Sequence, residues 1–321
     1  MATTEFLHGM RERVSVVEET SYGSGGDMAA NGAIIGYNAA ITAGFDQGFQ
    51  EITTNGADDR AVEDYSSGPA QYPFTLTFAV TSWKWLKYMF ACADAGSDPY
   101  THTLTLANTV ESFKCEWAKR ATTSHVLTLT GCVIKKARIR FSKATGEGKE
   151  GLITVEAECV AKTSTPGTTV TTLDAGNLSA TPFKFFNTKF TLAGSEVVEV
   201  NNGEINIDNG IKEEDSRYCN STAARNISDP IPSKFLIDAT FNVNVKNDTY
   251  YDLWATADEI TSTNTLEFER ATNDDLVMTF AKLFIFKGVA STNLEGVTNV
   301  DLVTKITKFT SLIATDAISS Y

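Results

Sequence analysis

Residue types that often carry out chemistry are present in this chain, but their spacing does not build a catalytic centre. The three histidines, His8, His102 and His125, lie in unlike sequence contexts, so a histidine-based active site is not expected. No serine lies in the G-x-S-x-G pattern that marks a nucleophile elbow. We therefore expect no catalytic residue and no enzyme activity.

Candidate cofactor and metal sites are equally weak. The glycines of GSGG, residues 23–26, do not complete the phosphate-binding pattern G-x-x-x-x-G-K-[ST] and predict a flexible loop. The run EED, residues 213–215, could offer carboxylates to a cation, but the spacing of a calcium loop is absent. Five scattered cysteines lack a C-x-x-C pair and read as buried thiols: Cys92, Cys115, Cys132, Cys159 and Cys219. We expect no cofactor and no bound metal.

The charge of the chain limits its partners. The net charge is −13 over 321 residues, with −4 in residues 1–165 and −9 in residues 166–321. Because an acidic surface repels phosphate, tight nucleic-acid binding is not expected. The apolar runs are too short to span a bilayer, and the N-terminal segment lacks the apolar core of a signal peptide. We expect a protein made in a cytoplasm, without membrane insertion.

The sequence segments that would position any site occur twice along the chain. TFAVTSWKWLKYMFACAD, residues 77–94, matches TFNVNVKNDTYYDLWATADE, residues 240–259, at an offset of 163. Further matches follow in the same order, and the offset later falls to about 150, which places about 15 extra residues between Asp94 and His125. This predicts two tandem domains, 1–165 and 166–321, joined by a linker at about 163–183.

The sequence of each predicted domain indicates mostly β-strands. YPFTLTFAV alternates so that its apolar residues share one face: Tyr72, Phe74, Leu76, Phe78 and Val80. In KKARIRF the apolar residues Ala137, Ile139 and Phe141 alternate with the basic stripe Lys136, Arg138 and Arg140, for which a subunit interface or a solvent face is favoured over DNA contact. One helix is expected per domain, after Ser82 and near Asn247. The predicted fold is mainly β: an antiparallel β-sandwich or barrel with one flanking helix, made twice.

Two long polar segments interrupt this pattern, residues 44–69 and 209–232. Loops of about 25 residues inside a compact domain are usually functional. Two interpretations stay open: a solvated excursion, or an arm that reaches a neighbouring subunit.

The order of these features resembles the major tail tube proteins of tailed viruses of bacteria and archaea. The resemblance begins with RVSVVEETSYGSGG (13–26), continues through the polar arm to YPFTLTFAV and WKWLKYMF, and closes with PYTHTLTLANTVESFKCEWAK (99–119). The duplicated plan covers nearly the whole chain and is similar to members whose subunit is a tandem fusion of two tube domains.

The resemblance implies a structural virion protein. Three chains would form a ring with pseudo-sixfold symmetry, and stacked rings would form the hollow tail tube that delivers the genome. The expected partners are other copies of the chain and the tape measure, tail terminator and distal tail proteins. Viral DNA would pass through a negative lumen without specific binding. The expected location is the virion tail, after assembly in the host cytoplasm.

The same resemblance assigns the arms, the N-terminal segment and the linker to contacts between domains and rings. The repeated pairs Arg60 with Asp64 and Arg225 with Asp229 are candidates for such contacts; the alternative is that each pair holds the arm of its own domain. The full set of interface candidates is Arg60, Asp64, Arg225, Asp229, Glu213, Glu214, Asp215 and Tyr22.

A protein of another class could share this outline. Two β-sandwich domains with polar loops could be a carbohydrate-binding module or a virion decoration protein. A sugar site requires aromatic side chains exposed on one flat face, whereas the aromatic residues here recur at core spacing, which favours the tube.

Overall fold

A computed structural model gives the structure and describes residues 12–45, 49–52, 64–67, 70–120, 123–143, 151–174, 181–212, 230–244, 259–291 and 298–321. The described residues form two large antiparallel sheets and one two-stranded sheet. The mainly β fold predicted from the alternation of polar and apolar residues is therefore confirmed.

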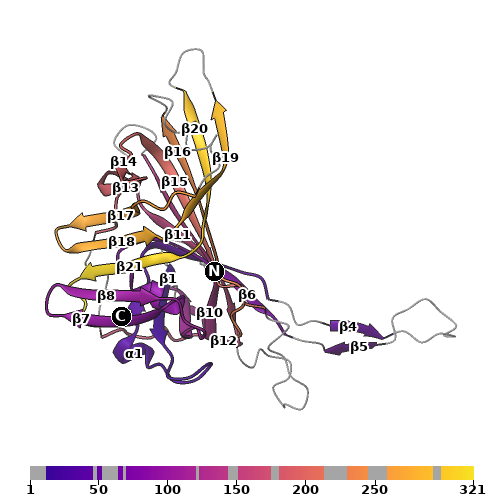
Figure 1. The fold of residues 1–321 in the computed structure, drawn as a ribbon. Coiled ribbons are helices and arrows are strands. Elements are labelled where there is room, and N and C mark those ends of the chain that lie inside the picture. Colours follow the sequence, from indigo (N-terminus) through magenta and orange to yellow (C-terminus); the bar gives the residue numbers. More distant parts are fainter. Residues whose placement is uncertain are drawn as a thin grey trace, which may run out of the picture.

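The larger sheet has twelve strands, eight of which follow the hydrogen-bonded order β19-β20-β16-β15-β10-β11-β6-β3 (Figure 1). All neighbours along this path are antiparallel. The strands are β3 (Tyr37–Ala43), β6 (Tyr72–Ala79), β10 (His125–Ser142), β11 (Thr154–Ala161), β15 (Val200–Asp208), β16 (Leu236–Asn244), β19 (Leu283–Ser291) and β20 (Asn299–Ile306). Four strands come from each half of the chain, and β15 and β10 join the halves.

The four other strands of this sheet are attached through β10, which has 18 residues. The N-terminal part of β10 pairs with β9 (Phe113–Lys119) and β12 (Thr163–Gly167), and β9 continues to β1 (Glu12–Glu18) and β2 (Ala33–Ile34). Pairing shifts around Gly131, whose φ of 63° is left-handed and where an added Cβ would lie 2.6 Å from Cβ of Lys162. The glycine at this position allows β10 to pair with β9 and β12 through its N-terminal part and with β11 and β15 through its C-terminal part.

The second sheet has seven strands in the order β14-β13-β17-β18-β21-β8-β7. Their bounds are β7 (Ala91–Gly96), β8 (Tyr100–Thr105), β13 (Thr188–Leu192), β14 (Ser195–Glu196), β17 (Asn264–Ala271), β18 (Asp274–Phe280) and β21 (Phe309–Asp316). In Figure 1 these strands cross the direction of the larger sheet.

The two halves of the chain use the same order of neighbours. β2-β1-β9-β10-β12 corresponds to β14-β13-β17-β18-β21, and β10-β11-β6-β3 corresponds to β19-β20-β16-β15. Among the described residues, two hairpins lie outside this correspondence: β4 (Phe49–Ile52) with β5 (Asp64–Ser67), which form the separate two-stranded sheet, and β7 with β8. The β7–β8 hairpin overlaps the stretch in which the sequence predicts extra residues. β8 pairs with β21, so this hairpin of the first half extends a sheet of the second half.

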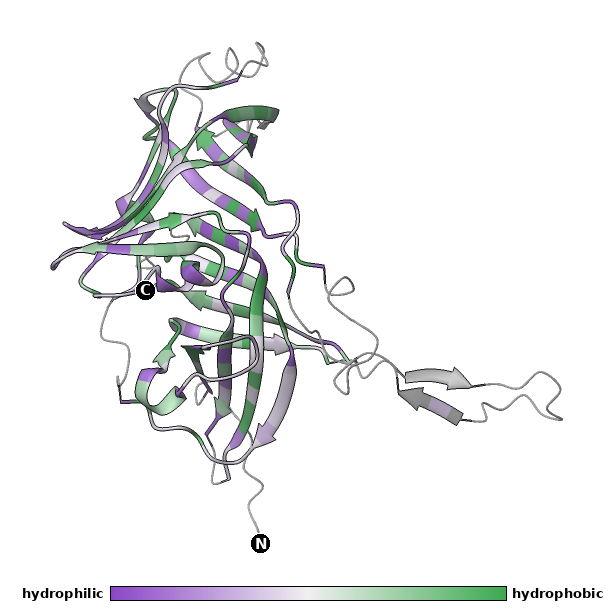
Figure 2. Cartoon of the chain, turned by 60° about the horizontal axis from the view of Figure 1, so that its bottom comes forward, coloured by the Kyte–Doolittle hydropathy of each residue, from purple (hydrophilic) through white to green (hydrophobic). Residues whose placement is uncertain are grey.

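One hydrophobic cluster takes residues from both halves. The alternation predicted for β6 and β10 is confirmed: Phe74, Leu76 and Phe78 are buried, as are Ala137, Ile139 and Phe141. Figure 2 shows the corresponding change of colour from residue to residue along the strands. Burial of these side chains from water is the main force that stabilises the fold.

The expected flanking helix of the first half is only partly right. Ser82 Oγ does accept a hydrogen bond from the backbone N–H of Lys84 at 3.1 Å, but the helix is the short 3₁₀ helix η2 (Lys84–Tyr88). The chain enters β7 at Ala91, because pairing with β8 replaces the helical continuation through Cys92. Other short helices are α1 (Met28–Asn31) and η3 (Phe185–Asn187). The second expected helix lies outside the described residues.

The expected linker and arm contain more structure than their composition suggests. Residues 163–167 form β12, and Phe183 is buried with its ring 5.2 Å from that of Trp83. The arm at 44–69 contains the strands β4 (Phe49–Ile52) and β5 (Asp64–Ser67), which pair as a hairpin and extend away from both large sheets (Figure 1). Within the described parts of the chain, no helix is long and apolar enough to cross a membrane.

Candidate assembly surface

The larger sheet ends in two open edges, β3 and β19. Each has one neighbour along the path. On the outer side of β19, Leu283 exchanges backbone hydrogen bonds with Ile260 in an isolated bridge, and beyond it neither edge has a neighbouring strand among the described residues. β3 reads YNAAITA and carries no charge, and β19 reads LFIFKGVAS with one lysine. Edge strands that stay solvated are usually protected by charges, prolines or bulges. Both edges contain a register shift, between Tyr37 and Ala40 in β3 and between Ile285 and Lys287 in β19, but β10 and β15 contain similar shifts and still pair with each other. These two edges are suited to strand pairing.

The direction of the backbone groups on β3 follows from one hydrogen bond. The N–H of Gly44 donates to the carbonyl oxygen of Pro73 at 3.2 Å, toward β6. Because successive N–H groups point to opposite sides of a strand, the N–H of Ala43 points outward from the sheet edge. Ala43 is partly buried on its side-chain side, against the core.

The face of the larger sheet that carries Lys136, Arg138 and Arg140 is called the polar face below. The register places Lys305, Asp238, Asn206, Arg138 and Glu156 side by side across five neighbouring strands. Such cross-strand neighbours interact directly. Lys305 Nζ lies 3.0 Å from Asp238 Oδ2, and Arg138 Nε donates to Asn206 Oδ1 at 2.9 Å.

Two arginines and two glutamates form a lattice at the junction of the halves. Arg140 lies 2.8 Å from a carboxylate oxygen of Glu156 and 3.0 Å from one of Glu204. Arg138 lies 3.2 Å from Glu204 and 3.8 Å from Glu156. All four side chains are about a third to half exposed, so water screens their attraction, and each pair stabilises the fold only weakly. The clearer effect is that both guanidinium groups are already occupied by carboxylates.

The charges of the polar face are nearly balanced. Among the described residues its cations are Lys136, Arg138, Arg140, Lys287 and Lys305, and its acids are Glu156, Glu158, Glu204, Asp208, Asp238 and Asp301. One excess acid contrasts with a net charge of −13 for the chain. Most of the acidic excess therefore lies elsewhere.

Of the interface candidates chosen from the sequence, Tyr22 is described in full. Lys162 Nζ lies 4.8 Å from the centre of its ring, and the ring packs against a small buried cluster of Val133, Val160 and Ile211. The loop around it is fixed by the buried carboxylate of Glu19, which accepts from Gly23 N–H, Gly131 N–H and Ser112 Oγ. Tyr22 thus anchors the N-terminal segment to its own chain, and the loop expected to be flexible is packed.

The other candidates are less completely placed. Asp64 begins β5, where its backbone pairs with Ile52, but its side chain is outside what the structure describes. Arg60, Glu213, Glu214, Asp215, Arg225 and Asp229 lie outside the described residues. Their role at an interface stays a prediction.

A groove of about 1520 Å³ is lined by parts of β1, η2, the β17–β18 turn and the C-terminal segment. Two of its cations are paired with acids: Lys87 pairs with Glu18, and Arg270 lies 2.6 Å from Asp274. Arg270 also donates to the backbone carbonyl oxygens of Thr81 and Thr181. Both cations are therefore held by contacts within the chain.

Comparison with known proteins decides between the tube and its rivals. The model of the phage tail tube protein family matches residues 9–307. The chain belongs to the phage tail tube protein family. It is accordingly a structural protein of the virion tail, and the suspected resemblance is confirmed. No curated protein sequence matches the chain.

For a tail tube protein, the features that sequence reasoning missed are the identities of the open edges. Nothing in YNAAITA or LFIFKGVAS marks them as the ends of a sheet, because any half-buried strand has a similar composition. The low charge of β3 was the available signal, since a solvated edge is usually charged.

Proposed function

We propose that three copies of this chain close into a ring of six tube units, and that stacked rings form the hollow conduit for the viral genome. The observation that carries this proposal is the strand path of the larger sheet. Its two open edges, β3 and β19, correspond to β15 and β10, which already pair at the junction inside the chain. An edge that fits its counterpart within one chain is suited to the same contact between chains.

Strand register supports a tandem origin of the two units. Ile41 of β3 pairs with Leu76 of β6, and Ile205 of β15 pairs with Ala239 of β16, offsets of 164 and 163. The pair Phe78 with Val155 has the counterpart Phe241 with Leu302. The proposed units are residues 1–165 and 166–321.

The equivalence also specifies the contact between chains. Within the chain, Arg138 pairs with Asn206, and Ile139 with Ile205. Transferring these pairs by the offsets 149 and 164 sets Lys287 of one chain opposite Thr42 of the next, and Gly288 opposite Ile41. Eight strands from each of three chains then give a closed inner barrel of twenty-four strands, with no exposed edge.

The polar face forms the bore in this arrangement, since the opposite face of the sheet is buried in the core. Its balanced charge does not support the strongly negative bore expected from the composition. DNA passes without sticking for another reason: Arg138 and Arg140 are occupied by Glu156 and Glu204, so few counterions are released when a phosphate approaches.

The remaining partners follow from this role. The β4–β5 arm and the segment at 209–232 reach neighbouring units and rings, where Arg60, Asp64, Arg225, Asp229 and residues 213–215 are the candidate contacts. The tape measure, tail terminator and distal tail proteins meet the inside and the ends of the tube, after assembly in the host cytoplasm.

A disulfide across the closing edges tests the ring. Thr42→Cys combined with Lys287→Cys places the two cysteines in a non-hydrogen-bonded pair, with Cα atoms about 4.5 Å apart, which suits a disulfide. We expect oxidation of the assembled protein to give a covalent ladder that ends at the trimer on a non-reducing gel.

The matched control is Thr42→Cys with Val303→Cys, because Val303 pairs with Lys287 one strand further from the edge, about 10 Å from Thr42 in this register. The control should stay monomeric on the gel. A ladder that ends at the hexamer would contradict the trimer, and equal cross-linking by both variants would contradict the register.

Removing the carboxylates that occupy the arginines should create DNA affinity. In the variant Glu156→Gln with Glu204→Gln, Arg138 and Arg140 become available to phosphate. We expect salt-dependent binding of duplex DNA by the unassembled chain, weakening about tenfold between 50 and 200 mM salt, as two phosphate contacts predict. Fluorescence anisotropy of a labelled duplex measures this.

The control for net charge is Glu158→Gln with Asp301→Asn, which removes two acids of the same face without touching the lattice. Asp301 accepts a hydrogen bond from Asn242 rather than from an arginine. If both double variants bind DNA equally, net charge and not the lattice governs passage.

A further inference from the structure

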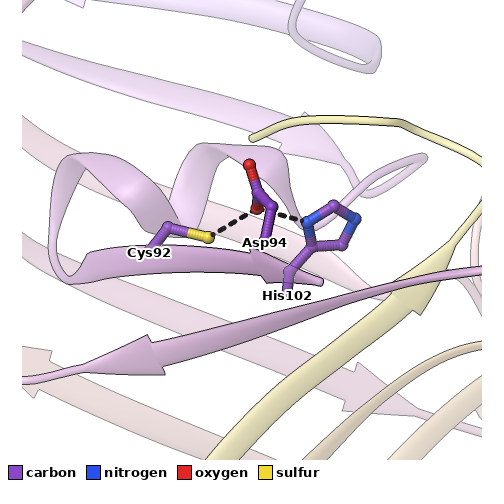
Figure 3. Close-up of side chains that lie close together, drawn as sticks. All are labelled: Cys92, Asp94 and His102. Carbon is purple, nitrogen blue, oxygen red and sulfur yellow. Dashed lines mark hydrogen bonds and ion pairs between the residues drawn. The ribbon is translucent and has the colours of Figure 1, made fainter. Parts of the chain in front are cut away.

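The β7–β8 hairpin brings together three residue types that bind transition metals. Cys92 and Asp94 lie on β7 and His102 on β8, and Figure 3 shows their side chains pointing toward one another. Asp94 Oδ1 lies 3.2 Å from Cys92 Sγ and 2.7 Å from His102 Nδ1, and the three candidate ligand atoms are all within 4.8 Å of one another. Sulfur, imidazole nitrogen and carboxylate oxygen are the donors that Zn²⁺ takes in proteins.

The other ring nitrogen of His102 is hydrogen-bonded to a carboxylate of the C-terminal segment. Its Nε2 lies 3.2 Å from Asp316 Oδ1, and Asp316 also accepts from Tyr321 OH and from the N–H of Ile318, each at 2.7 Å. The ring of Tyr321 stacks on the imidazole at 3.6 Å. A metal-binding histidine usually donates its second N–H to a carboxylate, which leaves the first nitrogen free to coordinate. Asp316 and Tyr321 supply that support here.

The cluster is reachable from one side. His102 is fully buried, whereas Cys92 is half-buried and 29% of the Asp94 side chain is exposed. Ligand atoms around Zn²⁺ lie about 3.3–3.7 Å apart, given the usual bond lengths. To admit an ion, Asp94 Oδ1 has to move away from both partners by less than about 1 Å, while Cys92 Sγ and His102 Nδ1, which lie within 4.8 Å of each other, have to come to the same spacing. One coordination position then faces solvent.

Hydrogen bonds order the cluster in the arrangement described. Burial, followed by the hydrogen bond to Asp94, raises the pKa of Cys92 to about 12, so its sulfur is a thiol at neutral pH. Burial opposes ionisation of Asp94, but hydrogen bonds from His102, Cys92 and the N–H of Tyr321 outweigh it and lower the pKa of that carboxyl. When the metal binds, two protons leave to solvent: the thiol proton of Cys92, and the proton that His102 Nδ1 shares with Asp94.

We propose that Cys92, Asp94 and His102 form a site for one divalent transition metal of the zinc class, with water in the fourth position. All three ligands lie on the hairpin of the first half, and His102 is tied through Asp316 to β21 of the second half. The ion therefore fixes the hairpin where it joins the other unit's sheet. This inference does not depend on the proposed ring.

Cobalt titration of the full-length chain tests the site. Co²⁺ occupies zinc sites and gives a thiolate-to-cobalt charge-transfer band when sulfur is a ligand. We expect one Co²⁺ per chain, with a band that Zn²⁺ abolishes by competition. The melting temperature should rise with free Zn²⁺, because the folded state binds the ion, and it should fall again with EDTA.

Cys92→Ser should remove the band, and Cys219→Ser should leave it unchanged; Cys219 lies outside the described residues and is the control for another thiol. Asp94→Asn should weaken Zn²⁺ binding at least tenfold. Because His102 is buried, its substitution risks misfolding. The variant that decides the test is therefore Cys92→Ser, at a half-exposed position. A band that persists in Cys92→Ser, or a wild-type chain that retains no metal, would overturn the proposal.

Discussion

Ala43→Pro is expected to abolish ring assembly while the chain stays folded. The N–H of Ala43 points away from β6, so proline removes a donor that only a neighbouring chain would use. Edge strands tolerate proline at such positions, and the restriction on the preceding Thr42 is compatible with its extended backbone. Electron microscopy and sedimentation, under conditions in which the wild-type chain assembles, measure the loss.

Ala43→Ser is the matched control, because it keeps the backbone donor and a small side chain. We expect it to assemble like the wild type, and all three proteins to melt within a few degrees of one another. Closed rings formed by Ala43→Pro would contradict pairing through β3. A large drop in melting temperature would instead place that N–H inside the fold.

Phe141→Ala should lower the free energy of unfolding by about 3–5 kcal/mol. Phe141 is 2% exposed and lies over Gly203, where an added Cβ would come within 2.3 Å of its ring. Its ring centre is 6.3 Å from that of Phe241 and 5.3 Å from that of Phe268, so a side chain of the first half is packed among rings of the second. Alanine leaves a cavity at the junction of the halves. Urea unfolding followed by circular dichroism gives the change.

Phe286→Ala is the control for removing a phenylalanine. Phe286 is 73% exposed, so its removal should change the stability of the monomer by no more than about 0.5 kcal/mol. If both variants unfold at the same urea concentration, the shared core does not hold the halves together.

Several features followed from the sequence because they depend on local periodicity. Period-two alternation assigns Phe74, Leu76 and Phe78 to one face of a strand, whatever that strand pairs with. The basic stripe Lys136, Arg138 and Arg140 was likewise placed on an outer face. The change of offset between the two halves predicts extra residues between Asp94 and His125, and the β7–β8 hairpin lies partly in that stretch. The duplication itself stays a prediction.

Local patterns failed where distant pairing decided the outcome. WKWLKYMFACA has helical spacing, yet pairing of β7 with β8 ends the helix at Tyr88. Cys92, Asp94 and His102 have no metal-binding spacing along the chain, and the hairpin alone brings them together. The same holds for Arg138, Glu156 and Glu204, which meet because three strands lie side by side.

The sequence by itself determined the β class and most of the order of elements in the first half, because these follow from composition and from the spacing of apolar residues. The family was indicated by the resemblance of that order to tail tube proteins. Tertiary structure decided which strands end the sheet, where the β7–β8 hairpin docks and how the charges of the polar face cancel. The physical reason is that strand pairing joins residues far apart in the chain. Arg140 and Glu204 are 64 positions apart, and His102 and Asp316 are 214 apart. Spacing along the chain carries no direct record of such contacts.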